Sequence, residues 1–541
     1  MNSITFNIDA VNINAISEIQ QCLDLYDITS LVFLLYDIPH MALEHLALLQ
    51  RIPKEDRKDI NTLCDWEIIV METQTVYFVG VDVGSGSVRA ALVNEQGHVL
   101  KSAVKEIQTW NPKADYYEQS SDNIWNCCVD VIKIVVADVN VHRIKGIGFD
   151  ATCSLVVLDV NGCPASVSES NNEKQNIIMW MDHRAQSEAD FINGTGHDIL
   201  KYVGGKVSLE MEMPKILWLK KNFPERWAKF DNFFDLPDFL TWKATGCKTR
   251  SLCSLVCKWN YECSAERKRG WNVDFLNKIG LGDLCENNFR KIGHKVLVPG
   301  EPCGNGLAPK IAEELGLLPQ TPVATSIIDA HAGGLGMIGT SAPMIDKDIT
   351  GRLSLICGTS TCHMAINNNA VQVRGVWGPY FSAMVPNMWL NEAGQSASGM
   401  LLDYVICSHP ASQKLFETMN TGEVRNHLRE LLSQIANGQG LSNVNLLTKD
   451  FHMWPDFHGN RSPLADPTMK GMIVGLTINN SIENLAILYL ACLQALANNF
   501  AKGTVVLEIA VPKKNRSECE RVISRDTSLD DVRVHQPDAR L

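Results

Sequence analysis

Hydrophobic and polar positions along residues 77–93 predict two β-strands joined by a tight turn. The segment reads YFVGVDVGSGSVRAALV, and its central Gly-Ser-Gly-Ser turn separates two apolar runs. Glycines permit the positive φ angles that many tight turns require. Asp82 interrupts the first apolar run, where a lone carboxylate is costly unless something compensates its charge. The pattern therefore fits either an ordinary hairpin or a hairpin that holds a phosphate.

From residue 77 onward, strand-like runs alternate with helix-like stretches, which is typical of an α/β fold. IKGIGFD and RLSLICG predict strands, whereas MPKILWLKKNF and DLPDFLTWKATG predict helices. A second hairpin pattern, SLICGTSTCHMAIN, resembles the first when Gly358 is set on Gly84. Two similar hairpins suggest two domains of related topology around a shared cleft. Taken alone, so short a match fits two unrelated hairpins better.

The two ends of the chain depart from this pattern. Residues 1–72 carry apolar positions at helical spacing, which predicts a helical N-terminal extension. Its stretches ITSLVFLLYD and ALEHLALLQRI resemble a death-effector-like bundle, a module that would dock a helical-domain partner. A fusion in the gene model is the alternative. Residues 503–541 read as a divergent polar tail, rich in charge and poor in large apolar side chains.

The composition is that of a globular protein with more than one domain. The chain has 541 residues, 45% hydrophobic and 20% charged. Its net charge of -12 argues against nucleic acid as the main partner. The longest early apolar run is too short to span a bilayer, so we expect no membrane association.

The 17 cysteines are scattered and form no pairs with zinc-type CxxC spacing. Cys253 and Cys257 lie four residues apart, which fits buried free thiols better than a metal site. Together with the lack of a recognisable signal peptide, this cysteine usage predicts a cytoplasmic protein with reduced thiols.

Two segments carry acidic residues where an α/β protein would place a site. Asp329 ends the apolar run TPVATSIID, a position where ligands usually bind, and would suit a general base. The simpler alternative is a helix N-cap, a role that Asp serves well. Glu392, in NEAGQSASGMLLDYV, precedes glycines and a predicted helix start whose N–H groups could hold an anion.

Further polar side chains gather in two loops and at one helix start. WPDFHGNRSPLAD fits either a site or a structural loop tied by hydrogen bonds. WMDHRA brings Asp182 and Arg184 together, as paired groups for a polyol or as a plain salt bridge. Lys215 begins a helix, where it either contacts a polyol or lies along apolar surface with its charge in water.

Seven motifs, in family order, resemble the FGGY family of carbohydrate kinases. They run from about residue 77 to about residue 496: GVDVGSGSVRAALV, GFDATCSLVVLD, WMDHRA, IIDAHAGG, CGTSTCHM, WLNEAGQSASG and DFHGNRSPLAD. The resemblance implies the actin/hexokinase-like (ribonuclease H-like) two-domain fold with an ATP cleft. The domains would occupy residues 76–340 and 350–500. The implied activity is transfer of phosphate from ATP, with Mg²⁺, to a pentulose, with D-ribulose at its 5-hydroxyl as the expected acceptor.

The resemblance also assigns site residues. Asp329 is the expected catalytic base, and Asp82 is expected to orient Mg²⁺ through water. The nucleotide phosphates are assigned to the two turns: Gly84, Ser85, Gly86, Ser87, Gly358, Thr359 and Ser360. Gly399 is expected near the nucleotide. The sugar is assigned to Ala151, Lys215, Glu392 and Asp329, and the polyol pattern above adds Asp182 and Arg184.

The chain departs from the family after LAILYLACLQALA. The family continues into a strand and a Gly-Gly-rich loop that grips adenine and ribose, whereas this chain continues with NNFAKGTVVLEIAVPKKNRSECERV. We therefore expect a second domain that is C-terminally truncated, with apolar surface exposed. The alternative to an active kinase is a catalytically inactive sugar-binding or regulatory protein without the adenosine-binding loop.

Overall fold

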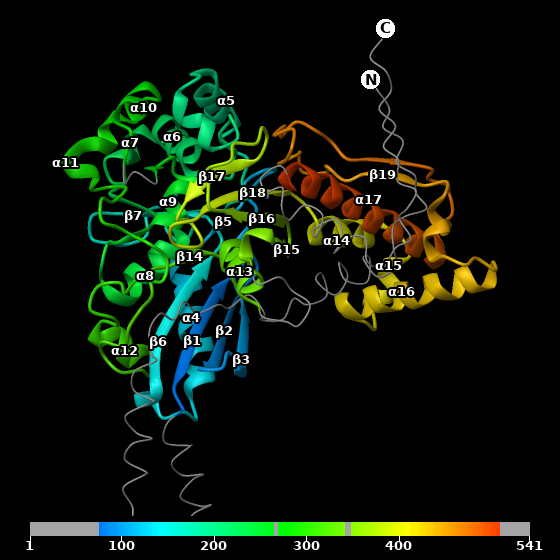
Figure 1. Ribbon diagram of the computed structural model, residues 1–541, viewed down its shortest axis with the longest axis horizontal. Coiled ribbons are helices and arrows are strands. Elements are labelled where there is room, and N and C mark those ends of the chain that lie inside the picture. The colour runs from blue at the N-terminus through cyan, green and yellow to red at the C-terminus, as the bar shows by residue number, and fades with distance from the viewer. Residues whose placement is uncertain (1–74, 265–268, 341–347, 509–541) are drawn as a thin grey trace, which may run out of the picture.

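The computed structural model describes residues 75–264, 269–340 and 348–508. The predicted helical extension at residues 1–72 lies outside these ranges, as does the predicted polar tail from residue 509 onward. Within the described ranges the α/β expectation is confirmed, because sheets and helices alternate throughout both halves (Figure 1).

A five-stranded sheet forms the base of the first half. Its order is β14-β6-β1-β2-β3, in which β1 runs parallel to β6 and antiparallel to β2. Helix α4 (Ser121–Val136) packs against β2 and β3, and its apolar side chains share one hydrophobic core with the sheet. The strands are β1 (Tyr77–Val83), β2 (Ser87–Asn94), β3 (Val99–Glu106), β6 (Ile144–Ala151) and β14 (Ile327–Ile328).

A second sheet of the first half has the order β4-β5-β8-β7-β9 and packs beneath a cap of helices (Figure 1). Its strands, with those of two small two-stranded sheets, are β4 (Thr109–Trp110), β5 (Glu118–Gln119), β7 (Leu155–Leu158), β8 (Ile177–Ile178), β9 (Asn232–Asp235), β10 (Arg250–Ser251), β11 (Glu262–Cys263), β12 (Arg269–Gly270) and β13 (Val296–Leu297). The helices are α5 (Gln186–Gly194), α6 (Glu212–Asn222), α7 (Pro224–Trp227), α8 (Leu236–Thr245), α9 (Leu252–Lys258), α10 (Val273–Lys278), α11 (Glu286–Phe289), α12 (Pro309–Leu315) and α13 (Asp329–Gly339).

The second half is built on a four-stranded antiparallel sheet of order β15-β16-β18-β17. Helices α14, α16 and α17 contribute to a separate hydrophobic core beside it (Figure 1). Its elements are β15 (Leu353–Cys357), β16 (Thr361–Asn367), β17 (Trp377–Phe381), β18 (Trp389–Gln395), β19 (His452–Trp454), β20 (Met472–Val474), α14 (Gly399–Ser408), α15 (Ser412–Phe416), α16 (Thr421–Gly438) and α17 (Ile482–Glu508). Helix α17 continues beyond residue 503, so the expected start of the tail lies inside a helix.

Both predicted hairpins are present. Strands β1 and β2 pair up to Val83 and Val88, and strands β15 and β16 pair up to Cys357 and Thr361. The glycines of the two turns do not have φ in the left-handed region, contrary to the sequence-based expectation. A Cβ at Gly84, Gly86 or Gly358 would meet only ordinary van der Waals contacts or open space, so neither φ nor crowding within the protein requires glycine at these positions.

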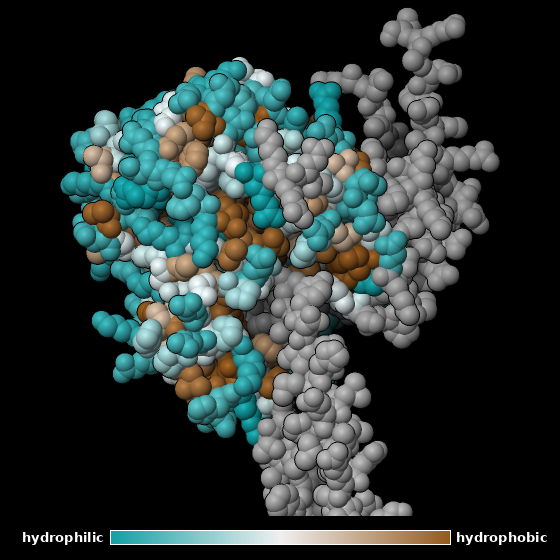
Figure 2. All heavy atoms as spheres, turned by 60° about the vertical axis from the view of Figure 1, so that its left-hand side comes forward, coloured by the Kyte–Doolittle hydropathy of each residue, from teal (hydrophilic) through white to brown (hydrophobic). Residues whose placement is uncertain are grey.

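Polar and apolar residues share the visible face of the described part (Figure 2). Figure 2 shows hydrophilic residues over much of one face, with apolar patches between them. Exposed large apolar side chains include Val99, Leu100 and Val104 on the edge strand β3. Among the described residues, none of the helices combines the length and the apolar character that crossing a bilayer requires.

Candidate active site

The turns of the two hairpins face a common cleft of about 740 Å³. The first turn comes from the sheet of the first half and the second turn from the sheet of the second half. The cleft therefore lies where the two halves of the chain meet. Its lining includes the predicted residues Asp82, Gly84, Ser85, Gly86, Ser87, Asp329, Gly358, Thr359, Ser360 and Glu392.

The first turn is fixed by contacts from the second sheet of the same half. Trp180 donates from Nε1 to the Ser85 hydroxyl at 2.9 Å, and Gln119 donates from Nε2 to the Ser85 carbonyl at 2.9 Å. A Cβ at Gly86 would meet no atom within 4 Å. The turn is thus held rigidly while open space remains at Gly86, which is the arrangement a phosphate cradle needs.

The second turn is joined to the start of helix α14. The Gly399 N–H donates to the Gly358 carbonyl at 3.0 Å, and the Ser398 N–H donates to the Thr359 carbonyl at 2.9 Å. Gly399 itself is not among the described residues that line the cleft, although it contacts the turn that does. The expectation that it lies near the nucleotide stays a prediction.

Three carboxylates gather at the ends of neighbouring strands. Asp82 on β1 lies opposite Asp150 on β6, and Asp329 follows β14 as the first residue of α13. Burial, followed by the neighbouring Asp82, raises the pKa of Asp329 to about 7. Burial, with Asp82 and Asp329, also raises the pKa of Asp150 well above its usual range. Asp329 is not the N-cap, because that position is held by Ile328.

The donor set fits a hard divalent cation such as Mg²⁺, which prefers oxygen ligands. Asp82 is 2.8 Å from Arg89 Nη1, so one of its oxygens is already paired. Oδ1 of Asp150 is buried and has no hydrogen-bond partner. Three carboxylates against one guanidinium leave an excess of negative charge that a divalent cation would balance.

Glu392 forms the opposite polar wall of the cleft. Its carboxylate lies 3.9 Å from Lys258 Nζ and 3.6 Å from His331 Nε2. Burial opposes ionisation, but Lys258, His331 and Arg461 together hold the pKa of Glu392 below its usual range. The wall therefore presents a carboxylate and an ammonium group side by side, a combination that binds hydroxyl groups.

An ion pair joins the two halves beside this wall. Arg461 Nη2 lies 2.8 Å from Glu210 Oε1, and both side chains are almost fully buried. The loop that carries Arg461 is tied internally, because Asp456 accepts hydrogen bonds from Trp454 at 2.6 Å and Asn460 at 3.0 Å. The loop WPDFHGNRSPLAD is thus both a structural loop and a contributor to the cleft.

The predicted sugar contacts Ala151 and Lys215 do not line the cleft. Ala151 lies in the hydrophobic core, while the next residues, Thr152 and Cys153, line the cleft. The Lys215 side chain is fully buried, 3.5 Å from Glu212. Neither position supports a direct sugar contact, and their role in sugar binding stays a prediction.

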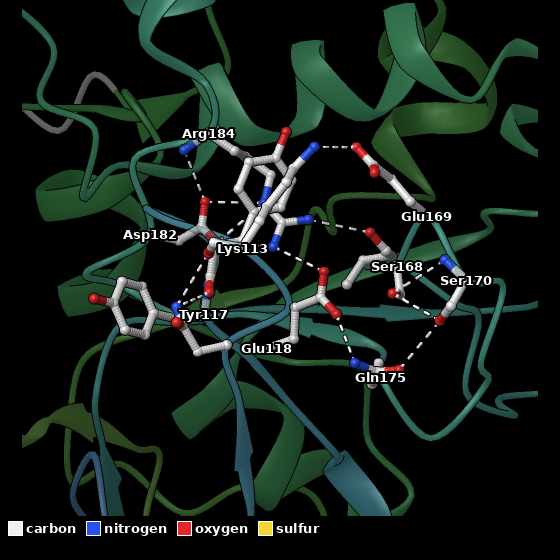
Figure 3. Close-up of polar contacts among 12 residues, drawn as sticks. Lys113, Tyr117, Glu118, Ser168, Glu169, Ser170, Gln175, Asp182 and Arg184 are labelled. Carbon is white, nitrogen blue, oxygen red and sulfur yellow. Dashed lines mark hydrogen bonds and ion pairs between the residues drawn. The ribbon is translucent and has the colours of Figure 1, made fainter.

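Asp182 and Arg184 belong to a buried polar cluster outside the cleft lining. Figure 3 shows the Arg184 guanidinium between two carboxylates, 2.8 Å from Asp182 and 2.9 Å from Glu118. Gln175 donates a further hydrogen bond to Glu118 at 2.9 Å. Asp182 and Arg184 therefore form the salt bridge that was the alternative to polyol binding. Their sugar-binding role stays a prediction, which their position outside the cleft lining does not support.

The sequence analysis did not identify Lys258, which lines the cleft, or Asp150, which lies opposite Asp82 without lining the cleft. It quoted Arg461 only as part of the polar loop WPDFHGNRSPLAD. Asp150 ends the run IKGIGFD in the same way that Asp329 ends TPVATSIID, and this repeated signal could have identified it. Lys258 is a charged residue at the end of the apolar helix α9, which was a weaker signal. The sequence carried no sign that Arg461 would meet Glu210, because 251 residues separate them.

Comparisons with known proteins identify the family to which the chain belongs. The model of the FGGY family of carbohydrate kinases, N-terminal domain, matches residues 77–336, and that of the C-terminal domain matches residues 353–523. A third model, Caspase-8, N-terminal domain, matches residues 9–75, which lie outside the described structure except for the last residue. The structural role of that segment stays a prediction.

Three relatives align with most of the chain. FGGY carbohydrate kinase domain-containing protein of Xenopus laevis is 52% identical over 432 residues, covering 78% of this chain and 77% of the relative. The human protein of that name is 52% identical over 429 residues, with the same coverage. A D-ribulokinase of Saccharomyces cerevisiae is 40% identical over 447 residues, covering 78% of this chain and 62% of the relative.

Solved structures support the fold. Xylulose kinase from Rhodospirillum rubrum superposes with a TM-score of 0.60 at 17% identity, covering 80% of this chain and 79% of that one. Glycerol kinase of Plasmodium falciparum gives a TM-score of 0.59 at 14% identity, covering 81% and 80%. The expected actin/hexokinase-like two-domain fold is confirmed. The chain belongs to the FGGY family of carbohydrate kinases, whose members are phosphotransferases.

Proposed function

We propose that this protein transfers the terminal phosphoryl group of ATP to a pentulose, with D-ribulose at its 5-hydroxyl as the substrate. The observation that carries the proposal is the position of Asp329. It is a partly buried carboxylate in the same cleft as the two hairpin turns, which come from different halves of the chain. The identity to a D-ribulokinase supports the choice of sugar.

Asp329 is suited to act as a general base. A base works best when its pKa lies near the operating pH, and burial with Asp82 raises the pKa of Asp329 to about 7. Its Oδ1 already accepts a hydrogen bond from the Ala330 N–H at 2.7 Å, which fixes the orientation of the carboxylate. The other oxygen would accept the proton of the attacking hydroxyl.

The phosphates would be held from both sides of the cleft. Backbone N–H groups of the turns at Gly84–Ser87 and Gly358–Ser360 would donate to phosphate oxygens. Asp82 and Asp150 would hold Mg²⁺, with Asp82 acting through water. When bound, Mg²⁺ neutralises charge on the phosphate oxygens. Closing the two domains would exclude water, which otherwise competes with the sugar as the phosphoryl acceptor.

The sugar would lie between the base and the Glu392 wall. Glu392 accepts hydrogen bonds and Lys258 donates them, so neighbouring hydroxyl groups of a sugar could bind both. Losing either partner would leave the other buried and uncompensated. Discrimination among pentuloses would then depend on which hydroxyl is brought to Asp329.

The proposal is tested with purified full-length protein, ATP, Mg²⁺ and a panel of pentuloses, pentitols and hexuloses. We expect ADP formation with D-ribulose, and a drop of about 10² to 10⁴-fold in kcat for Asp329→Asn. Asp138→Asn is the matched control, because Asp138 is exposed on the surface. Absence of turnover on every sugar, or an Asp329→Asn variant within tenfold of wild type, would overturn the proposal. Sugar binding in calorimetry without ATP binding would instead favour the inactive alternative.

A further inference from the structure

Two thiols and an imidazole meet behind the Glu392 wall. Cys253 and Cys257 are one helical turn apart on α9, and His331 approaches them from α13. Their candidate ligand atoms all lie within 4.8 Å of one another, and all three side chains are buried. The four-residue spacing alone favoured plain buried thiols. His331 comes from a distant part of the chain and supplies a third ligand, which the spacing of the two cysteines could not reveal.

One interatomic distance matches that expected in a tetrahedral zinc site. With Zn–S of about 2.3 Å and Zn–N of about 2.0 Å, a tetrahedral angle places sulfur and nitrogen about 3.5 Å apart. The observed distance from Cys257 Sγ to His331 Nε2 is 3.4 Å. The second ring nitrogen of His331, Nδ1, is buried and has no hydrogen-bond partner.

Glu392 lies beside His331 but outside the group whose ligand atoms are all within 4.8 Å of one another, so its side chain would have to turn to become the fourth ligand. Its Oε2 lies 3.6 Å from His331 Nε2, close to the oxygen–nitrogen separation expected around one zinc ion, about 3.4 Å. Two thiolates and one carboxylate around a divalent cation leave one net negative charge. Lys258, 3.9 Å from Glu392, would balance that charge. Glu392 lines the cleft, so an ion could enter from there.

We propose that Cys253, Cys257 and His331, completed by Glu392, form a site for a borderline-soft divalent metal ion such as Zn²⁺ at the back of the cleft. Binding would convert the two thiols to thiolates and release two protons to solvent. A metal ion bound to Glu392 would make that carboxylate unavailable to the sugar, so filling the metal site would weaken sugar binding. This inhibitory consequence rests on the proposed function, whereas the metal site itself does not.

The site is tested by Co²⁺ titration of full-length, chelator-treated protein carrying Cys163→Ser and Cys407→Ser, which remove the exposed thiols of the described part. Binding of Co²⁺ to thiolates gives a sulfur-to-metal charge-transfer band, and Zn²⁺ should abolish it. We expect Cys257→Ser to abolish the charge-transfer band that wild type shows at one equivalent of Co²⁺, or to raise the Kd for Co²⁺ at least tenfold. Cys128→Ser is the matched control, because Cys128 is a buried thiol in the separate core under α4.

Equal Co²⁺ binding in Cys257→Ser and Cys128→Ser would overturn the proposal, as would absence of the charge-transfer band at one equivalent. If the serine variant is unfolded in chelator, X-ray absorption of zinc-loaded wild type decides. Two sulfur neighbours support the site, and fewer than two refute it. Inhibition is measured separately: Zn²⁺ should raise the sugar KM in Cys128→Ser but not in Cys257→Ser. A protein that binds Co²⁺ at Cys257 yet phosphorylates no sugar would refute only the proposed function.

Discussion

Replacing Arg184 with methionine should destabilise the protein without altering the sugar site. The Arg184 side chain is fully buried between Asp182 and Glu118, at 2.8 and 2.9 Å. Methionine keeps much of the volume but leaves two buried carboxylates facing each other without a cation. Removing one partner of a buried ion pair typically costs about 3–5 kcal/mol. In a domain of this size that corresponds to a fall in Tm of roughly 6–20 °C.

The penalty should depend on pH, with a sign that follows from protonation. Burial already raises the pKa of Glu118, and Arg184 opposes that rise. Without Arg184 the folded-state pKa rises further above the unfolded value, so the folded variant binds a proton more tightly. Stability is therefore lost as pH rises through that folded pKa, and the difference from wild type should be smaller at pH 5 than at pH 8.

The assay is thermal unfolding at both pH values, followed by sugar KM at a temperature where the variant is folded. Lys101→Met is the matched control, because Lys101 pairs with Asp138 on the surface, where such pairs contribute about 0–1 kcal/mol. Arg184→Lys should rescue little, since one ammonium group cannot replace the forked contacts to both carboxylates. A variant with wild-type Tm and a strongly raised sugar KM would refute this reasoning and restore the sugar-binding role that the sequence suggested.

Three further predictions concern the cleft. Trp180→Phe removes the 2.9 Å hydrogen bond to Ser85 and should raise the ATP KM up to about tenfold with little change in sugar KM, measured by steady-state kinetics. Lys258→Met should raise the sugar KM by tenfold or more, because Glu392 loses the cation that does most to lower its pKa; an unchanged KM would contradict a role of the Glu392 wall in sugar binding. At subsaturating substrates, kcat/KM should rise with pH up to about 7 and then level off, because Asp329 must be ionised to accept a proton. A profile flat from pH 5.5 to 8 would exclude Asp329 as the base.

Local signals predicted the two hairpins and the α/β class, whereas the two-domain fold and the phosphate-binding roles of the turns came from the family resemblance. Each hairpin is specified by an apolar alternation around a Gly-Ser turn, and such patterns depend only on neighbouring residues. Asp329 was recognisable for the same reason, since it stands at the end of an apolar strand. The glycines were predicted correctly as turn residues, although they do not have the positive φ that was expected of them.

The Glu392 wall was harder to predict because it is assembled from distant parts of the chain. Lys258, His331 and Glu392 come from α9, α13 and β18, and no local pattern links them. Lys215 was easier to notice in the sequence because it lies at a helix start. In the structure, however, its side chain is fully buried next to Glu212. Asp182 and Arg184 formed the pair that their spacing suggested, but the fold placed that pair in the interior.

The ion pair between Glu210 and Arg461 constrains how the cleft can open. Separating two buried, oppositely charged groups would leave both charges uncompensated. The cost, several kcal/mol, would make opening at this contact too slow for rapid substrate exchange. We therefore expect the two halves to rotate about this contact rather than to part at it. The pair would act as the pivot of domain motion, and the parts of each half farthest from it would move the most.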